Sequence, residues 1–278
     1  MMVKPLSSEL VLRINSALVM VVLTLALTYA GTTTFAGLIL FAATLMSWEW
    51  GRVVRGSNID RIFVIQSVAI IAAGYATLIG ERVLAIAIIV AATWIVFRVH
   101  KNSELTSDPW WSAAGVYYAG FPAIALIAIR QDPDYGFHAI IYLFLVVWSA
   151  DTGAFFVGRF FGGPKLAPSI SPNKTWSGFI GGAVTAGVAG VLFALWFEHT
   201  SVEIMAGLSV VLAIISMGGD LGESFIKRAF GVKNSSGLIP GHGGVLDRLD
   251  GLVFAAMGAG LIAAAADPLK PGRALLIW

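Results

Sequence analysis

The sequence contains no cysteine and few charged residues. Of its 278 residues, 58% are hydrophobic and only 12% are charged, whereas soluble domains average about 25% charged residues. The absence of cysteine excludes disulfide bonds, thiolate nucleophiles and cysteine-ligated metal sites. The formal net charge of +2 is too small to indicate nucleic-acid binding.

The hydrophobic residues form runs of roughly 20 residues, the length that crosses a bilayer as a helix. Short polar stretches separate these runs, and most of the charges lie there. This pattern predicts an all-α, polytopic integral membrane protein with about nine transmembrane helices. The predicted spans are residues 12–30, 33–50, 62–80, 83–99, 111–129, 136–158, 177–197, 203–219 and 251–266.

Lysine and arginine are unevenly divided between the two sides of the membrane that these spans define. Fourteen of the 18 basic residues, Lys4 among them, fall on one side and four on the other. Because cytoplasmic loops carry the excess of Lys and Arg, this bias predicts a cytoplasmic N-terminus and an external C-terminus. We expect a multi-pass protein of the inner (cytoplasmic) membrane of the cell.

No internal repeat or linker marks a separate soluble domain. We predict an N-terminal region, residues 1–130, with about five spans and ordinary loops, and a C-terminal catalytic region, residues 131–278. Two polar stretches of the second region, residues 151–176 and 219–250, are predicted as cytoplasmic loops. The span count places both loops on the same side, so they can meet.

The stretch at 219–250 combines carboxylates, basic side chains and a glycine-rich turn at 240–244. Carboxylates near a membrane suggest a hard divalent cation such as Mg²⁺, which often keeps substrate phosphates in its shell. Basic groups and glycine backbone N–H groups suit phosphate oxygens. The alternative is a solvated loop in which the charges balance. The PGHGG sequence argues against this alternative, because it is not typical of a plain linker. The titratable residues of this stretch are Asp220, Glu223, Lys227, Arg228, Lys233, His242, Asp247, Arg248 and Asp250.

Two residues of the stretch at 151–176 are further candidates. Asp151 follows an apolar run, and a charge at the centre of a membrane helix costs about 2.5–3.5 kcal/mol on insertion scales. Asp151 should therefore face a polar interior and bind a metal ion or a cation, unless it is an interfacial residue at a helix end. Lys174 lies at a predicted helix N-terminus and forms a candidate anion site, although a basic residue is also common there.

The spacing of these residues resembles a known family signature. The segment SFIKR at 224–228, followed by KN at 233–234 and by PGHGGVLDRLD at 240–250, is similar to the signature of the phosphatidate cytidylyltransferases. These enzymes are also called CDP-diacylglycerol synthases. The resemblance covers residues 151–250 closely and the rest of the chain loosely. One position departs from it, since the family usually has Asp after the second Lys, where this chain has Asn234.

The resemblance implies that CTP reacts with phosphatidate in the lipid bilayer to give CDP-diacylglycerol and pyrophosphate, a step of phospholipid biosynthesis. It also implies a divalent metal ion, expected to be Mg²⁺, and a homodimer. Asp220 and Asp247 are the implied metal ligands, and Asp250 and Asp151 are weaker candidates. The catalytic candidates are Lys227, Arg228, His242, Asp247 and Arg248, and the substrate-binding candidates are Ser224, Lys233, Lys174, Gly243 and Gly244.

Two other functions remain open from the sequence. A CTP-dependent polyprenol or phytol kinase would use similar residues but would release CDP instead of pyrophosphate. A cation-coupled transporter could use Asp151 and Asp220, but inverted-repeat transporters often show two matching halves, and no such repeat is evident.

Overall fold

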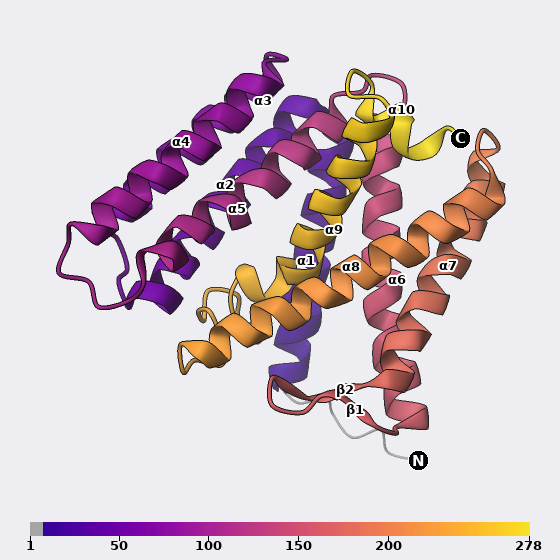
Figure 1. Cartoon of the computed structure of the whole chain (residues 1–278). Coiled ribbons are helices and arrows are strands. Elements are labelled where there is room, and N and C mark those ends of the chain that lie inside the picture. Colours follow the sequence, from indigo (N-terminus) through magenta and orange to yellow (C-terminus); the bar gives the residue numbers. More distant parts are fainter. Residues whose placement is uncertain (1–7) are drawn as a thin grey trace.

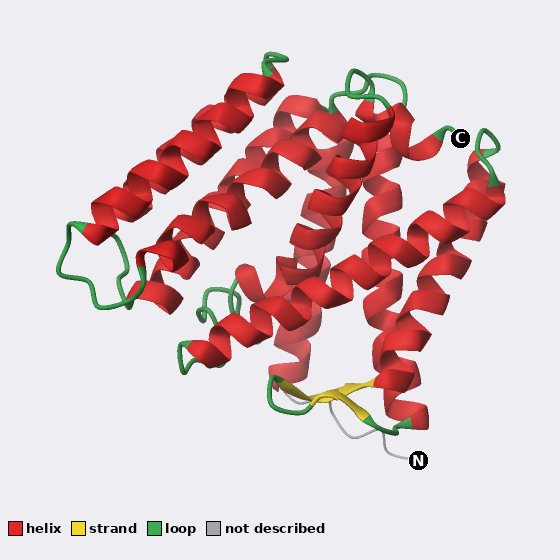
Figure 2. Cartoon of the chain, viewed as in Figure 1, coloured by secondary structure: helices red, strands yellow, loops and turns green. Residues whose placement is uncertain are grey.

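The computed structural model describes residues 8–278, with side chains from Leu12 onward. Lys4, which the charge count assigns to the cytoplasm, lies outside the described residues. The described chain is almost entirely helical (Figure 2). The helices are α1 (Ser8–Ala30), α2 (Thr32–Arg55), α3 (Arg61–Leu78), α4 (Arg82–Lys101), α5 (Pro109–Arg130), α6 (Gly136–Phe161), α7 (Trp176–Phe197), α8 (Val202–Ala229), α9 (Leu246–Ala266) and α10 (Pro271–Leu276); the strands are β1 (Lys165–Ala167) and β2 (Ser171–Thr175).

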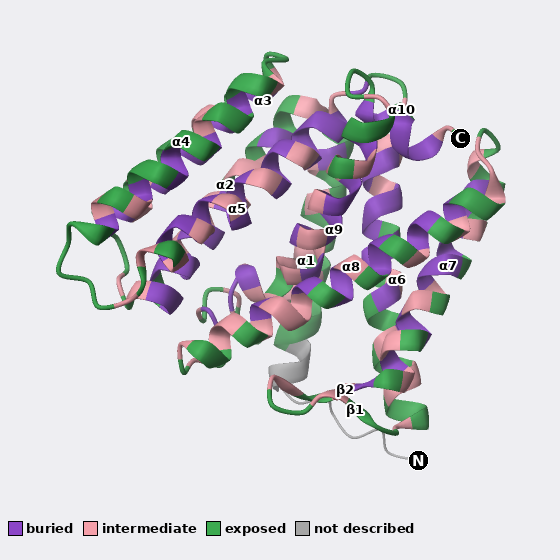
Figure 3. Ribbon diagram, viewed as in Figure 1, coloured by how far each residue is buried: buried purple, intermediate pink, exposed green. Residues whose placement is uncertain are grey.

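Exposed residues recur along the outer helices (Figure 3). Many of them carry large apolar side chains, as a lipid-facing surface requires. Each of the nine predicted spans overlaps one of α1–α9. Eight of these helices are long and apolar enough to cross a membrane, and α2 is not among them. Three threonines at its start and charged residues toward its end lower its hydropathy. The polytopic all-α fold is therefore confirmed, while the count of nine spans and the side of the N-terminus remain predictions.

The helices form two packed groups that meet along α5 and α9 (Figure 1). In the first group α3 and α4 pack on α5, and α2 packs on α3 and α5. In the second group α6 packs on α7, α7 on α8, and α8 on α9. Successive long helices run in opposite directions, so the hairpin and the segment 230–245 lie at the same end of the bundle (Figure 1).

Glycines bring α6 and α7 into close contact. A Cβ atom added at Gly178 would lie 2.8 Å from the carbonyl oxygen of Ala154, and one at Gly182 would lie 2.7 Å from that of Ala150. Small residues that let backbones approach are typical of membrane helix interfaces. This contact fixes the part of α6 that carries Asp151 beside the start of α7.

The two polar stretches contain more regular structure than the sequence predicts. Residues 151–161 continue α6 and residues 219–229 continue α8, so neither segment is a loop. The reason is that a helix continues across the membrane boundary wherever its backbone hydrogen bonds can still be made. Asp151 accordingly lies inside α6, not at its end.

The two strands of the described residues form a short antiparallel hairpin, with Lys165 opposite Thr175 and Ala167 opposite Ser171. Thr175 ends β2 and caps α7, because its Oγ1 accepts a hydrogen bond from the backbone N–H of Gly178 at 3.1 Å. The cap fixes the direction in which the chain enters α7 and thereby the place of the preceding Lys174.

Candidate active site

A polar cavity of about 810 Å³ lies where the two polar stretches come together. Side chains of α6, the hairpin, α7, α8, the segment 230–245 and α9 form its wall. The expectation that the two stretches meet is thus confirmed. The titratable residues of the wall are Asp151, Arg159, Lys174, Asp220, Lys227, His242, Asp247, Arg248 and Asp250.

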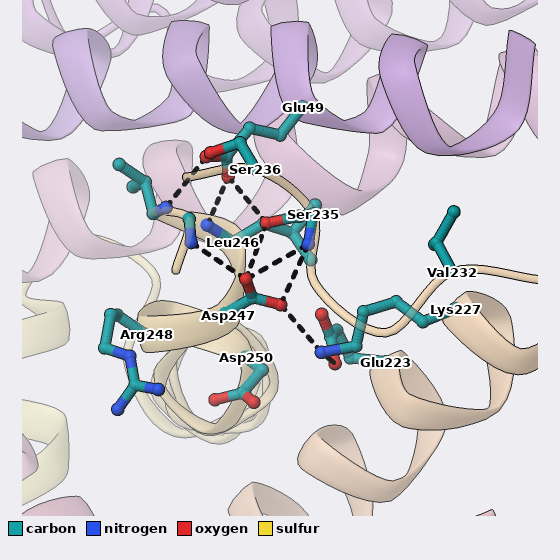
Figure 4. A network of polar contacts seen from close by, with 12 residues as sticks. Glu49, Glu223, Lys227, Val232, Ser235, Ser236, Leu246, Asp247, Arg248 and Asp250 are labelled. Carbon is teal, nitrogen blue, oxygen red and sulfur yellow. Dashed lines mark hydrogen bonds and ion pairs between the residues drawn. The ribbon is translucent and has the colours of Figure 1, made fainter. Parts of the chain in front are cut away.

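Asp247 lies in the first turn of α9, and its carboxylate has several hydrogen-bond donors (Figure 4). Its Oδ2 accepts hydrogen bonds from the backbone N–H of Gly244 at 2.8 Å and of Ser235 at 3.1 Å, and from Ser235 Oγ at 3.0 Å. Its Oδ1 accepts a hydrogen bond from Lys227 Nζ at 2.7 Å. A negative charge in the first turn also interacts favourably with the helix dipole. The carboxylate is therefore held in one orientation at the cavity wall.

Lys227 links α8 to α9 through two carboxylates. Its Nζ lies 2.7 Å from Glu223 Oε2, one helical turn earlier, and 2.7 Å from Asp247 Oδ1. Only 12% of the Lys227 side chain is exposed, against 1% for Glu223 and 7% for Asp247. Because charges out of water are stable only when paired, this ammonium group stabilises two carboxylates at once.

A second ion pair joins the hairpin to α8. Lys174 Nζ lies 2.6 Å from Asp220 Oδ2. The two residues come from the two polar stretches, so this contact connects them directly across the cavity.

Asp151 and Asp250 carry the remaining carboxylates of the cavity wall. Among the described residues, neither forms an ion pair with a basic side chain at contact distance. The carboxyl groups of Asp250, Asp151 and Asp220 line the same cavity. Such crowding of carboxylates favours the binding of a cation between them.

Comparison with known proteins decides the family. Residues 11–265 match the Cytidylyltransferase family. The chain belongs to this family. A phosphatidate cytidylyltransferase of Brucella suis biovar 1 is 43% identical over 256 residues, covering 90% of this chain and 91% of the relative. One of Haemophilus influenzae is 36% identical over 276 residues, covering 87% and 94%, and one of Staphylococcus aureus is 37% identical over 177 residues, covering 62% and 67%.

The cavity of this cytidylyltransferase-family protein suits a metal ion that shares its ligands with a substrate. In the described part of the chain, no three Asp, Glu or His side chains are arranged as a metal centre by themselves. Mg²⁺ is commonly held by one or two carboxylates together with waters and substrate phosphates. The carboxylates of Asp151, Asp220 and Asp250 share one cavity wall and provide oxygen donors of that kind.

The predicted site residues do not all line the same cavity. All four predicted metal ligands line the cavity, as do Lys174, Lys227, His242 and Arg248. Ser224 and Arg228 line neither cavity. The guanidinium of Arg228 instead donates to the backbone carbonyls of Ile170 at 3.4 Å and Val232 at 3.2 Å, and so connects the end of α8 to the hairpin.

A second cavity of about 670 Å³ adjoins the first and contains two more of the predicted residues, whereas the predicted Gly244 lines neither cavity. Lys233 and Gly243 line it, and Asn234, His242 and Arg248 belong to both cavities. Gly243 has a φ of +91°, a conformation that side chains other than glycine rarely adopt. Glycine is therefore required at this position by the shape of the turn. This requirement is independent of whether the backbone N–H groups of the turn bind phosphate.

Glu49 is a polar residue of this region that the sequence analysis missed. It lies in α2, is completely buried, and accepts hydrogen bonds from the segment that contains the glycine-rich turn (Figure 4). One signal was available, because an ionisable residue within an apolar run points to function by default. The expectation that the N-terminal region holds only ordinary loops and spans overlooked it.

Proposed function

We propose that this protein is a phosphatidate cytidylyltransferase, which converts CTP and phosphatidate to CDP-diacylglycerol and pyrophosphate. The observation that carries the proposal is a cavity with intermingled carboxylates and cations, in a chain whose relatives carry that name along 90% of its length. A phosphate oxygen of phosphatidate attacks the α-phosphorus of CTP. The bond from that phosphorus to the bridging oxygen of the β-phosphate breaks, and pyrophosphate leaves.

The attacking oxygen is already anionic near neutral pH, so the reaction needs no strong general base. The barrier is electrostatic, because one anion must approach another, and fixed positive charges lower it. Lys174, Lys227 and Arg248 line the cavity and would bind phosphate oxygens. Lys227 and Lys174 contact carboxylates, so their ammonium groups are already oriented before substrate arrives.

A divalent cation, Mg²⁺ in our proposal, would neutralise the triphosphate and the leaving pyrophosphate. Asp220 and Asp247 are the first candidates to hold it, and Asp250 and Asp151 are further candidates. Asp247 suits this role because its hydrogen bonds from Gly244 and Ser235 fix its orientation. Asp250 and Asp151 suit it because their carboxyl groups line the cavity and form no ion pair with a basic side chain among the described residues.

The lipid substrate would enter from the side of the bundle at α6. Phe155 lines the cavity and is also 58% exposed. Phe156, Phe160 and Phe161 continue this exposed aromatic surface to the end of the helix. Acyl chains could lie along these rings while the phosphate reaches the cavity. CTP would come from the cytoplasm, and Lys233 beside the second cavity would help to bind a phosphate.

The protein would act in the inner membrane, with the cavity facing the cytoplasm. The excess of basic residues at that end supports this orientation. A homodimer is a further expectation from the family resemblance. The names of the relatives favour the cytidylyltransferase over a polyprenol or phytol kinase and over a cation-coupled transporter.

The test is an assay of purified protein with labelled CTP, phosphatidate and Mg²⁺. We expect equal amounts of CDP-diacylglycerol and pyrophosphate and no CDP. Asp247→Ala should reduce the rate by at least about 100-fold, because the variant loses a carboxylate at the reacting phosphates. Release of CDP by the wild-type protein would instead identify a kinase.

Asp134→Ala is the matched control for this variant. Asp134 is an exposed carboxylate in the turn between α5 and α6, at the other end of the bundle. Its removal should leave the rate unchanged. Full activity of Asp247→Ala would contradict the role given to Asp247.

A further inference from the structure

Glu49 has an unusual environment for a carboxylate. Its side chain has no exposed surface, and it lies on α2 among apolar neighbours such as Met46 and Trp50. Within the described part of the chain, no basic side chain forms an ion pair with it. A buried charge without a partner costs several kcal/mol, so the hydrogen bonds to Glu49 have to offset that cost.

Among the described residues, the hydrogen-bond donors to Glu49 all belong to one short segment, residues 235–246. The backbone N–H of Val245 donates to Oε1 at 2.9 Å, and that of Leu246 donates to Oε2 at 2.6 Å. The hydroxyls of Ser235 and Ser236 donate to the same two oxygens. The serines precede the PGHGG turn and the two amides follow it. One carboxylate therefore fastens both ends of the glycine-rich segment to α2.

The same contact caps α9. The first N–H groups of a helix have no partner within the helix and are usually satisfied by a side chain just before it. Val245 stands at that position and has no polar side chain. Glu49 supplies the acceptor from another helix, and its negative charge suits the positive end of the helix dipole. A Cβ atom at Gly244 would overlap both Glu49 Oε1 and Ser235 Oγ, so the carboxylate packs directly on the backbone.

Ser235 connects Glu49 to Asp247. Its single hydroxyl proton faces two acceptors, Asp247 Oδ2 at 3.0 Å and Glu49 Oε2 at 3.3 Å (Figure 4). Its backbone N–H also donates to Asp247. Displacement of Ser235 would therefore change the donors that orient Asp247, and with them the ion pair to Lys227.

We propose that Glu49 is a positioning residue of the active site. It holds the segment 235–246 and the first turn of α9 so that Asp247, His242 and Arg248 face the cavity. Glu49 does not line the cavity and acts through the backbone that it binds. The inference rests on the proposed cytidylyltransferase activity for its kinetic test, but its structural test is independent of that activity.

The kinetic test compares Glu49→Ala and Glu49→Gln with the wild-type protein, with kcat expressed per folded protein. We expect Glu49→Ala to lower kcat about 100-fold, the order of effect that a 1 Å displacement of catalytic groups produces. Glu49→Gln keeps one acceptor oxygen, so its kcat should lie between that of Glu49→Ala and that of the wild-type protein. Such a partial rescue would show that the hydrogen bonds accepted by residue 49 matter for kcat, beyond the volume that its side chain fills.

Gln66→Ala is the matched control. Gln66 is also completely buried in the N-terminal helices and hydrogen-bonds to Ser47 and to the carbonyl of Ser112, but makes no bond to the segment 235–246. Its replacement should lower the unfolding temperature while leaving kcat per folded protein within about twofold of wild type. A similar loss of kcat in Gln66→Ala would assign the effect of Glu49 to general destabilisation.

Hydrogen–deuterium exchange gives the structural test. Peptides that cover residues 235–250 should exchange faster in Glu49→Ala than in wild type, and should be unchanged in Gln66→Ala. Unchanged exchange together with unchanged kcat in Glu49→Ala would overturn the inference. If the wild-type protein makes no CDP-diacylglycerol while exchange still rises in Glu49→Ala, the proposed activity fails and the structural role of Glu49 remains.

Discussion

Replacement of Lys227 by methionine gives the sharpest test of the electrostatic arrangement in the cavity. The change keeps most of the side-chain volume and removes the charge that lies 2.7 Å from both Glu223 and Asp247. The two carboxylates would not be affected equally. Asp247 keeps its donors from Ser235 and Gly244, whereas no described residue other than Lys227 contacts the carboxylate oxygens of Glu223 as a hydrogen-bond or ion-pair partner.

The expected loss of stability follows from the burial of Glu223, whose side chain is 1% exposed. Removal of one partner of a buried ion pair costs about 3–5 kcal/mol. At about 2–4 °C per kcal/mol for a chain of 150–250 residues, the unfolding temperature should fall by roughly 6–20 °C. Thermal unfolding in one detergent, followed by tryptophan fluorescence, measures this. Lys270→Met, which removes an exposed lysine at the other end of the bundle, is the control and should change little.

A second substitution tests whether the unpaired carboxylate of Glu223 causes the loss of stability. Lys227→Met combined with Glu223→Gln should recover most of the lost stability, because the double variant no longer buries an unpaired carboxylate. It should not recover activity, because it still lacks the ammonium group that we propose binds phosphate. The reasoning would be refuted if Lys227→Met unfolded within about 3 °C of wild type, which is about 1 kcal/mol. It would also be refuted if Glu223→Gln gave no recovery.

Two further predictions concern pH and metal. Burial by itself would raise the pKa of Asp60 at the start of α3, but hydrogen bonds from Arg55 and from the backbone N–H of Phe63 outweigh it, so the pKa lies below its ordinary value. This stabilisation should be present above the ordinary Asp pKa of about 4 and lost as the pH falls below it; the difference in unfolding temperature between wild type and Asp60→Asn should therefore shrink in acid, and a constant difference would contradict this account. Chelation of divalent cations with EDTA should abolish formation of CDP-diacylglycerol and added Mg²⁺ should restore it, whereas activity that persists in EDTA would exclude the proposed metal ion.

Much of the fold and of the site can be predicted from local sequence, because the relevant physical constraints are local. The runs of about 20 apolar residues predict α1–α9 since backbone groups in lipid must form their hydrogen bonds within a helix. The spacing of Ser224 to Arg228 and the PGHGGVLDRLD segment indicate the family without any coordinates. The charged residues of the cavity were also predictable as a set, because carboxylates and cations crowd together in two short polar stretches.

The tertiary structure decided how these residues pair and which of them act together. Lys227 contacts Asp247, which lies 20 positions later in the sequence, and Glu49 contacts Leu246, which lies 197 positions later. No local pattern encodes such contacts, because they depend on how α2, α8 and α9 pack. The sequence by itself determined a membrane-embedded helical protein and predicted a polar region suited to binding phosphates. Only the packing of the helices decided that a buried glutamate from the N-terminal region holds that region in place, since a charge buried in the bundle is stable only where the folded chain brings donors to it.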